Sequence, residues 1–493
     1  MDYKPLIKSF IQENGLVTHH INSFNDFIES GLQSVVTEIG NINPEMEEYE
    51  IRLDKISVGV PCVKEANGTI RKIFPNEARL RDLTYSAPLL LSMTPIQNGT
   101  ELEQIETPIG DLPIMLRSKK CLLHGLTAEE ITKTGEDPED PGGYFIVNGT
   151  ERVLVLVEDL AANMMNMNHV ALGTTTESVR IFSEKEWYRR RNSIDRKKDG
   201  SLIVNMPPFS KPIEFIVLMR ALGMDSDELI VNSISSNPQV QGELYVSFES
   251  AAEAVSRKDA LDHLGKKIAF GQGRPERIQR AERILDTFLL PHMGLDPKDR
   301  FAKAHFLAKM TDRVIKLHLG LTEIDDKDHY SNKRLRLAGS LFKDLFHVAF
   351  RAMINNTVYT LEKAYKRNRK FSIHTAIRSN FLTDRIQHAI ATGSWIGSRQ
   401  GISQHLDRLN YISAASHRRR VRSLLSTTQP HFEARDLHAT HWGRLCPSET
   451  PEGSNIGLVK NLSIMSKIST KKDDVLITET LEKMDVKLEG AKK

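Results

Sequence analysis

The sequence contains very little cysteine, no long hydrophobic run and no low-complexity tract. Its three cysteines, Cys62, Cys121 and Cys446, stand far apart among 493 residues and form no C-x-x-C pair. This spacing excludes a zinc ribbon and a disulfide framework. No run of about 18 apolar residues could span a bilayer, and the amino-terminal stretch lacks the charged and apolar regions of a signal peptide. A soluble protein of the reducing cytoplasm, without membrane contact, is expected.

Several enzymatic signatures are also absent. The sequence has no G-x-x-x-x-G-K-[ST] phosphate loop, no H-E-x-x-H and no G-x-S-x-G. Cys446 has His441 nearby in the sequence, so a Cys/His nucleophile is conceivable. A small buried loop residue is the favoured interpretation of this cysteine. The chain therefore carries no recognisable catalytic motif of these kinds.

The chain is long enough for two to four domains, and its positive charge is concentrated in one place. Its net charge is only +3, but residues 371–460 hold eleven Lys and Arg, ten of them Arg, against six Asp and Glu. The same window holds seven of the 17 histidines. A local excess of +5 favours a specific polyanion-contacting surface over a generally basic protein.

Hydrophobic periodicity predicts an α+β fold with segregated helix-rich and strand-rich parts. Helical spacing is expected over residues 6–39, 251–320, 335–366 and 383–392, and Gly320 is a plausible helix stop. Residues 50–157 shift towards the period of two that strands show, and 170–250 are expected to mix short strands with turns. Asn148-Gly149 predicts a tight hairpin, and the charged tail 471–493 is expected to be loosely ordered.

Two acidic groups are the candidates for a metal site. The segment EIDDKD, residues 323–328, has Asp325, Asp326 and Asp328 but runs directly into Lys333, Arg334 and Arg336. A solvated, salt-bridged turn is therefore favoured over a two-metal site. Glu449 and Glu452 are separated by Thr-Pro and are too few to be the sole ligands of a catalytic metal. The sequence predicts no metal site in this chain.

The segment RQGISQHLDRLNYISAASHRRRVRS, residues 399–423, is the strongest candidate for function. Its Arg residues are fork-shaped phosphate donors, and Gln404, Asn410 and several Ser can hydrogen-bond sugar or phosphate. Four Arg in five positions cannot share one face of a helix or strand, so some must point into the structure, with Asp407 and Asp436 as acidic neighbours. Nucleic-acid binding is favoured over a solvated basic edge. A second basic run, at 189–191 and 196–198, is weaker evidence.

From residue 435 onward the sequence RDLHATHWGRLCPSETPEGSNIGLVKNLSIMSKIS resembles the signature of the β-type, second-largest subunit of multisubunit DNA-directed RNA polymerases. Segments 74–89, 140–165, 325–346 and 391–420 resemble the archaeal and eukaryotic branch of this family, in the same order. The chain ends shortly after the signature, as in the split arrangement of some archaea. There a B-double-prime chain ends at this point and a separate B-prime chain supplies the rest.

The resemblance implies a domain organisation. A protrusion would be built from residues 1–168 and 335–394, with a lobe inserted at 169–334. A fork would follow at 395–470, and 471–493 would be a carboxy-terminal tail at the subunit split. In this family the catalytic Mg²⁺ belongs to the largest subunit, and the zinc site lies in the part of the β-type subunit beyond this chain. The implied partners are the B-prime chain, the largest subunit, template DNA, the RNA transcript and NTPs.

The resemblance also implies roles for individual residues. Gln404 and Arg418–Arg420 fall in the segment that lines the RNA–DNA hybrid, and His417 matches a histidine of bacterial relatives. The candidates for contact with nucleic acid are Arg399, Gln404, His417, Arg418, Arg419, Arg420, Arg422 and Arg435. Arg444, Glu449 and Glu452 match positions beside the incoming nucleotide. His405 and Arg408 depart from the bacterial residues, which leaves inhibitor sensitivity open.

Three hypotheses follow. The first is a polymerase subunit that holds template, hybrid and downstream DNA while the assembly performs nucleotidyl transfer, with no activity in the isolated chain. The second is a non-catalytic DNA-binding transcription regulator with a polymerase-like segment, against which the resemblance at 74–165 argues. The third is a stand-alone enzyme that uses EIDDKD as its metal site.

Overall fold

The computed structural model describes residues 3–46, 49–170, 173–185, 188–252, 254–269, 271–367, 372–397, 399–469 and 474–484. The chain divides into two compact units, Met1–Glu158 with Leu335–Lys493, and Asp159–Arg334. Each unit has its own core of buried apolar side chains. The predicted multidomain α+β fold is confirmed. The further division into protrusion, lobe and fork stays a prediction.

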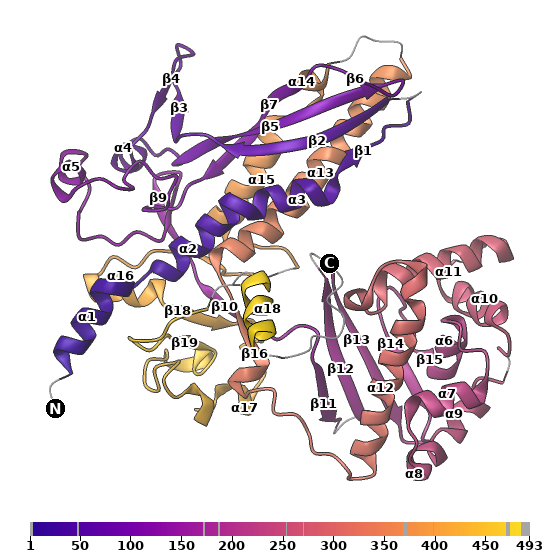
Figure 1. Ribbon diagram of the computed structural model, residues 1–493. Coiled ribbons are helices and arrows are strands. Elements are labelled where there is room, and N and C mark those ends of the chain that lie inside the picture. Colours follow the sequence, from indigo (N-terminus) through magenta and orange to yellow (C-terminus); the bar gives the residue numbers. More distant parts are fainter. Residues whose placement is uncertain are drawn as a thin grey trace. The chain divides into compact units, whose positions relative to one another are not determined.

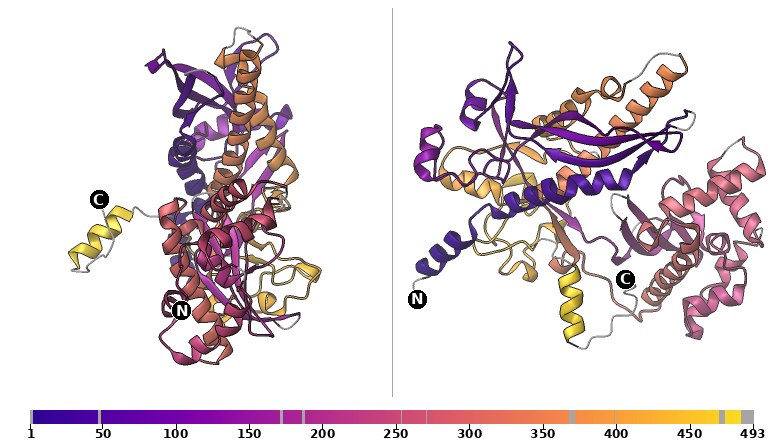
Figure 2. Two further views of the ribbon diagram at one scale, coloured as in Figure 1. Left: turned by 90° about the vertical axis from the view of Figure 1, so that its right-hand side faces the viewer. Right: turned by 45° about the horizontal axis from the view of Figure 1, so that its top comes forward.

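The first unit is built around an antiparallel sheet. Its strands are β1 (Asn41–Ile42), β2 (Tyr49–Val58), β5 (Ser86–Gln97), β6 (Thr100–Glu101) and β7 (Ile105–Pro113), and β5 lies between β2 and β7. Helix α15 (Ser379–Thr392) packs along β7, and the long helix α13 (Ala338–Tyr365) packs against α2 (Thr18–Asp26) and α15 (Figures 1 and 2). Segments distant in sequence therefore share one core.

Aromatic side chains join these segments. The ring of Phe24 lies 5.3 Å from that of Phe145 and 5.5 Å from that of Phe342, both edge-on. Phe145 and Phe342 are 5.1 Å apart, and all three side chains are fully buried. Such edge-on pairs add to the hydrophobic contribution of burying each ring. The cluster fixes the strand at Phe145 to helix α13, and this strand leads directly to the candidate site.

The sequence holds three Asn-Gly-Thr tripeptides, and in two of them the Asn-Gly pair forms a two-residue hairpin turn. Asn98 and Gly99 have φ of 50° and 72° between β5 and β6, and Asn148 and Gly149 have φ of 48° and 71° between β8 (Phe145–Val147) and β9 (Thr150–Leu154). Positive φ at both positions defines the type I′ turn, which Asn-Gly adopts readily. The hairpin predicted at Asn148 is therefore confirmed. The third pair, Asn67-Gly68, lies in a longer loop between β3 (Cys62–Lys64) and β4 (Ile70–Lys72).

The remaining elements of the first unit surround this framework. At the amino-terminal end they are α1 (Lys4–Asn14), a π-helical turn (Phe27–Gly31), α3 (Leu32–Ile39), α4 (Pro75–Leu80) and α5 (Ala128–Lys133). Towards the carboxy-terminal end they are β10 (Leu156–Leu160), β16 (Lys333–Arg336), α14 (Ile373–Ala376), β17 (Ser403–His405), α16 (Tyr411–Arg418), β18 (Arg420–Ser423), α17 (Phe432–Arg435), β19 (Val459–Asn461) and α18 (Asp474–Lys483). β10 and β16 lie at the two points where the chain passes between the units.

The second unit contains an antiparallel sheet in the order β11 (Met165–His169), β12 (Thr175–Lys185), β13 (Tyr188–Lys197), β14 (Leu202–Asn205) and β15 (Ile213–Glu214). Helix α12 (Arg300–His318) packs on the face that carries the buried Val179, Ile181 and Ile194. The other helices are α6 (Phe215–Ala221), α7 (Asp227–Ile234), α8 (Pro238–Gly242), α9 (Tyr245–Glu249), α10 (Arg257–Ile268) and α11 (Arg274–Phe288). Gly320 follows the end of α12 with φ of 68°, as predicted.

Three local predictions were wrong. Short strands and turns were expected over 170–250, but a run of helices begins at Phe215 and includes α9 where a strand was expected near residues 242–248. No helix was expected between Thr392 and the tail, but helix α16 forms there and begins with a reciprocal cap between Asn410 and Ser413. Part of the tail expected to be loose forms helix α18, and apart from Met484 its other residues lie outside the described residues. The helical spacing expected over residues 6–39 is confirmed by helices α1, α2 and α3. No helix among the described residues is long and apolar enough to cross a membrane.

Candidate nucleic-acid interface

Strand β18 is the base of the site. It pairs in parallel with β10, where Val421 lies opposite Leu156, and antiparallel with β19, where Val421 lies opposite Lys460. Side chains alternate between the faces of a strand, so Val421 points to the buried side while Arg420 and Arg422 share the opposite face. On the buried side Lys460 Nζ donates to Glu158 Oε2 at 3.0 Å, which locks β19 to β10. The two arginines thus stand on a three-stranded support.

The face of Arg420 and Arg422 forms the floor of a pocket of about 610 Å³. Gln404 of β17 and Asn461 of β19 contribute side chains from neighbouring strands, and the loop that precedes β19 forms one wall. The lining residues are Gln404, Arg420, Arg422, Ser448, Glu449, Thr450, Pro451, Asn455, Val459 and Asn461. The structure therefore brings four of the predicted site residues, Gln404, Arg420, Arg422 and Glu449, to one cavity.

Arg420 and Arg422 differ in the hydrogen bonds that their side chains make within the chain. Arg422 Nη1 donates to the carbonyl oxygen of Gly401 at 2.9 Å. A Cβ at Gly401 would lie 1.9 Å from this nitrogen, and its φ of +70° also favours glycine. Arg420, by contrast, has no hydrogen bond or ion pair from its side chain within the described part of the chain. Its guanidinium, half-buried in the pocket wall, keeps its donors for a ligand.

His417 orients Gln404. The backbone N–H of Asp407 donates to His417 Nδ1 at 3.2 Å, so the ring proton is on Nε2, which donates to Gln404 Oε1 at 2.9 Å. Gln404 Nε2 in turn donates to Gly401 O at 3.1 Å and has a second N–H directed elsewhere. Burial first, and then the charge of Arg420, lower the pKa of His417 to about 4. The imidazole is therefore neutral at physiological pH and acts by positioning the amide.

A pH prediction follows from His417. Its folded-state pKa lies below the ordinary value of 6.5, so the unfolded chain takes up the proton first as pH falls. The stabilisation is complete above about pH 6.5 and is lost progressively towards pH 4. We expect His417→Gln to reduce the loss of unfolding free energy between about pH 7 and pH 5, as measured by urea unfolding. His405→Gln removes an exposed histidine on β17 and is the control for the substitution itself. An unchanged slope in His417→Gln would contradict the assignment.

Arg418 and Arg419 are buried and hold the site together. Arg418 is 1% exposed, and its Nη1 donates to Asp140 Oδ1 at 2.8 Å and to Gly142 O at 2.9 Å. Arg419 Nη1 donates to Leu16 O at 2.8 Å, and its Nη2 donates to Ser463 O at 2.6 Å. Burial lowers the pKa of Arg419. Both side chains are buried and bonded within the chain, so both arginines position the neighbouring strand.

Asp140 is the acceptor at the centre of this anchor. Its Oδ2 accepts from Arg408 Nη2 at 2.8 Å and from the Tyr144 hydroxyl at 2.9 Å. The guanidinium carbons of Arg408 and Arg418 lie 5.1 and 5.9 Å from the centre of the Tyr144 ring. Burial alone would raise the pKa of Asp140, but the hydrogen bonds from the two arginines lower it to about 2. Asp140 is therefore an ionised carboxylate that joins helix α16 to the β8–β9 region.

Arg435 closes the loop around the pocket. Its guanidinium donates to five backbone carbonyls, those of Thr427, Gln429, Pro430, Ser454 and Ile456, at 2.7–3.3 Å. All five N–H donors of the side chain can be satisfied in this way. A Cβ at Gly457 would lie 2.2 Å from the carbonyl oxygen of Arg435, so the chain approaches it closely. Arg435 thus fixes two loop segments to each other.

The predicted nucleotide-site wall is only partly assembled within this chain. Glu449 lines the pocket, and its Oε1 accepts a short hydrogen bond from Ser416 Oγ, which also accepts from Asn461 Nδ2 at 2.6 Å. Arg444 is exposed, with Nη1 donating to Thr440 O at 2.8 Å, and Glu452 is exposed at the start of a short 3₁₀ turn. Arg444, Glu452 and Arg399 do not line the pocket. Arg399 pairs through its backbone with Trp395.

The acidic segment EIDDKD forms a bonded turn. Asp325 Oδ2 accepts from the backbone N–H of Met167 at 2.9 Å, and Asp326 Oδ1 accepts from that of Asp328 at 2.8 Å. Asp328 forms an ion pair with Lys333 at 2.8 Å, so the favoured salt-bridged interpretation is confirmed there. Across the described ranges, no group of three or more His, Cys, Asp and Glu side chains could hold a metal ion.

Comparison with known proteins identifies the family. A family model described as "RNA polymerase beta subunit" matches residues 15–384, and a second, described as "RNA polymerase Rpb2, domain 3", matches residues 404–468. The chain belongs to the RNA polymerase beta subunit family. The second match spans every residue that lines the pocket, from Gln404 to Asn461. The pocket therefore lies within a domain characteristic of these beta subunits.

Individual relatives in the beta subunit family are archaeal. The chain is 48% identical to "DNA-directed RNA polymerase subunit Rpo2" of Saccharolobus solfataricus over 98% of this chain and 43% of that protein. It is 44% identical to "DNA-directed RNA polymerase subunit Rpo2N" of Methanocaldococcus jannaschii, over 98% of this chain and 99% of that protein. The Rpo2N protein of Halobacterium salinarum is 42% identical over 96% of this chain. The chain thus spans less than half the length of its Rpo2 relatives.

Sequence reasoning missed several residues of this beta subunit site. Asp140 and Tyr144 both contact Arg418, from which they are 278 and 274 positions distant in the sequence. No local spacing could reveal contacts of this kind. Asn461 and Ser416 lie within quoted segments, and their small polar side chains could have been read as candidates to orient Glu449. The pairing of β18 with β19 brings them together, and the sequence alone gave no register for that pairing.

Proposed function

We propose that this chain is the amino-terminal part of the β-type, second-largest subunit of an archaeal DNA-directed RNA polymerase, of the Rpo2N or B-double-prime kind. The similarity to Rpo2N over 99% of its length carries the proposal. A B-prime chain is the first proposed partner. The largest subunit is the second proposed partner, and the proposed location is the cytoplasm.

The proposed domains are a protrusion at 1–168 and 335–394, a lobe at 169–334, a fork at 395–470 and a tail at 471–493. The two compact units, which divide after Glu158 and after Arg334, support a lobe inserted within a discontinuous first domain. The family model that ends at residue 384 and the one that begins at residue 404 support a separate fork.

The pocket on β18 is the proposed contact with nucleic acid. Arg420 directs an unpaired fork of N–H donors into it, which suits a backbone phosphate. The Gln404 amide, held by neutral His417, can hydrogen-bond a sugar hydroxyl or a base edge. Arg418, Arg419 and Arg435 hold the strand and loops in place. Arg399 and Arg422 are proposed to lie along the path of the bound nucleic-acid strand. Arg422 is held in place by its hydrogen bond to the carbonyl oxygen of Gly401.

The exposed residues Arg444, Glu449 and Glu452 are proposed to face the incoming nucleotide and groups from partner chains. An arginine can neutralise nucleotide charge, and carboxylates can orient cationic side chains. The catalytic Mg²⁺ of the assembly is proposed to belong to the largest subunit, where it would act as the Lewis acid for nucleotidyl transfer. This chain's part is to bind and to position template, transcript and nucleotide.

Reconstitution tests the proposal directly. A recombinant archaeal polymerase assembled without this chain should show no promoter-independent RNA synthesis on a tailed template, and adding the purified chain should restore it. The purified chain alone should incorporate no nucleotide. Equal synthesis with and without the chain would overturn the proposal and favour the regulator, whereas synthesis by the chain alone would favour the stand-alone enzyme.

A further inference from the structure

Three arginines of the second basic run, all on strand β13 of the unit formed by Asp159–Arg334, make contacts within that unit. Arg189 Nη2 donates to Asp159 Oδ1 at 3.0 Å, and the Arg190 guanidinium carbon lies 4.8 Å from the centre of the Phe288 ring. Arg196 Nη2 donates to Glu243 Oε2 at 2.7 Å. Arg191 is exposed, and within the described ranges its side chain makes no hydrogen bond or ion pair. Arg191 is therefore the member of the run that lines a pocket and has its donors available for a ligand.

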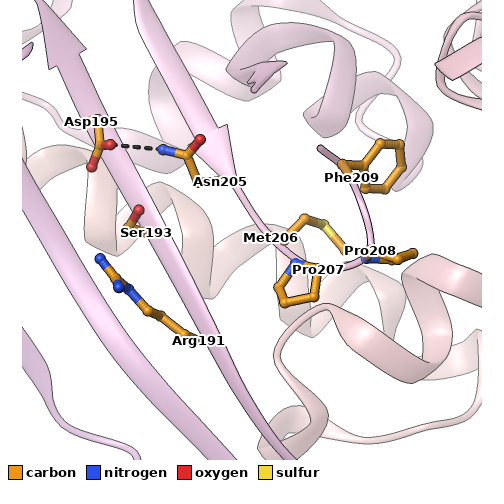
Figure 3. A pocket seen from close by; sticks show the side chains of 8 residues that line it. All are labelled: Arg191, Ser193, Asp195, Asn205, Met206, Pro207, Pro208 and Phe209. Carbon is orange, nitrogen blue, oxygen red and sulfur yellow. Dashed lines mark hydrogen bonds between the residues drawn. The ribbon is translucent and has the colours of Figure 1, made fainter. Parts of the chain in front are cut away.

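Arg191 lies at a pocket of about 410 Å³ that has a polar side and an apolar side. Figure 3 shows Arg191, Ser193 and Asp195 along β13 and Asn205 at the end of β14. The segment that leaves β14 supplies the apolar side, with the buried Met206 and the half-buried Phe209. A volume of this size is within the range of pockets that bind small ligands or short peptide segments.

The charges in the pocket favour one carboxylate over a polyanion. Asp195 is ionisable and lies on the same face as Arg191, and its two oxygens accept from Ser178 Oγ at 2.6 Å and from Asn205 Nδ2 at 2.7 Å. The pocket lining thus has one cation and one acidic group. A phosphate backbone would be repelled by Asp195 and would need more than one cation. A single acidic side chain can pair with Arg191 alone.

Strand β13 is only partly paired beside the pocket. Strand β13 pairs with β12 from Tyr188 to Lys197 but pairs with β14 only from Ser193 to Arg196. Among the described residues no strand pairs with 188–192 on the β14 side. An extended peptide can add to such an edge through main-chain hydrogen bonds, while adjacent pockets select its side chains. The occupant for which this geometry is suited is therefore a peptide strand.

We propose that this pocket and the edge of β13 at 188–192 bind an extended peptide segment of a partner protein. The segment continues the line of β14, places an acidic side chain on Arg191, and places an apolar side chain against Met206 and Phe209. The Asn205 amide, which keeps its oxygen and one N–H, is available to the peptide backbone.

Fluorescence anisotropy with the purified full chain tests this site. The probe is a labelled, capped heptapeptide of strand-forming residues, with an aspartate in the middle and a phenylalanine two positions later. Arg191→Glu should weaken its binding at least about tenfold, since a charge-assisted hydrogen bond is replaced by repulsion. Lys198→Glu, an exposed residue of the same basic run that does not line the pocket, is the matched control and should bind like wild type.

Two further probes separate the proposal from its alternatives. A peptide with lysine in place of aspartate should bind Arg191→Glu better than wild type, and a peptide N-methylated at alternate backbone nitrogens should bind neither. The proposal is overturned if wild type does not bind the aspartate peptide, or if Arg191→Glu binds it unchanged. It is also overturned if a short single-stranded RNA binds more tightly than the peptide and loses affinity in Arg191→Glu, because the pocket would then be a nucleic-acid site.

Discussion

Replacement of Asp140 by alanine is expected to lower the free energy of unfolding of the first unit by about 3–5 kcal/mol. The carboxylate accepts from Arg408, Arg418 and Tyr144, and its side chain is 14% exposed. Its removal leaves the Arg418 guanidinium, which is 1% exposed, with an uncompensated charge in a buried site. Remaining bonds from Arg418 to Gly142 O and Ala414 O satisfy some donors but supply no negative charge.

Urea unfolding of the purified chain at neutral pH, followed by circular dichroism and by tryptophan fluorescence, would measure this loss. The two probes are needed because a chain with two units need not unfold in one transition. Glu101→Ala is the matched control, since Glu101 pairs with Arg52 on the surface of the same unit and its loss should not measurably change stability. An Asp140→Ala variant as stable as Glu101→Ala would show that the buried anchor contributes nothing.

The partner substitution separates loss of the pair from loss of packing. Arg418→Met removes the buried cation while keeping much of the side-chain volume. The double variant Asp140→Ala, Arg418→Met should lose less stability than the sum of the two single variants. Each single variant leaves one charge of the pair without its partner, whereas the double variant removes both charges. Additive losses would mean that Asp140 and Arg418 act independently, despite the 2.8 Å contact between them.

Local signals in the sequence were sufficient where the structure is local. Asn148-Gly149 predicted its hairpin because the turn needs positive φ at both residues, and only a few residue types supply that cheaply. The helical spacing of apolar residues over 335–366 likewise predicted α13, because that periodicity is a property of the local sequence. The prediction of a strand near residues 242–248 failed. Tyr245, Val246 and Phe248 have high strand propensity, but the segment packs among helices and is itself helical.

At the candidate site the sequence predicted the basic segment but not which arginines are free. The expectation that four Arg in five positions could not share a face was correct in kind, because Arg418 and Arg419 are buried and Arg420 and Arg422 face the pocket. The alternation of β18 separates Arg420 and Arg422 from Val421, but the register that buries Arg418 depends on Asp140. A contact over 278 positions cannot be read from spacing. The loop wall at Ser448–Asn455 likewise depends on hydrogen bonds from Arg435 to the carbonyl oxygens of Ser454 and Ile456.

Arg420→Ala is expected to weaken elongation complexes about tenfold at low salt, and this expectation rests on the proposed function. The guanidinium has no side-chain partner among the described residues and faces the pocket, so its replacement should cost a ligand contact with little effect on folding. If that contact is a backbone phosphate, one fewer counterion is released on binding. The slope of log affinity against log salt should then become shallower by about 0.7–0.9. The difference from wild type therefore shrinks as salt rises.

Dissociation of reconstituted polymerase from a preformed RNA–DNA scaffold, measured over a range of salt concentrations, would give both quantities. Arg420→Lys keeps the charge and should retain most of the salt slope while losing the bidentate geometry. Arg81→Ala is the control. Arg81 lies far from Arg420 in the sequence and forms ion pairs with Glu65 and Glu77, so this variant should match wild type at every salt concentration. A weaker complex with an unchanged slope would replace the phosphate contact by a neutral one, to a sugar or a base. Unchanged affinity and slope would remove Arg420 from the interface and leave Gln404 and Arg422 as the pocket residues to test.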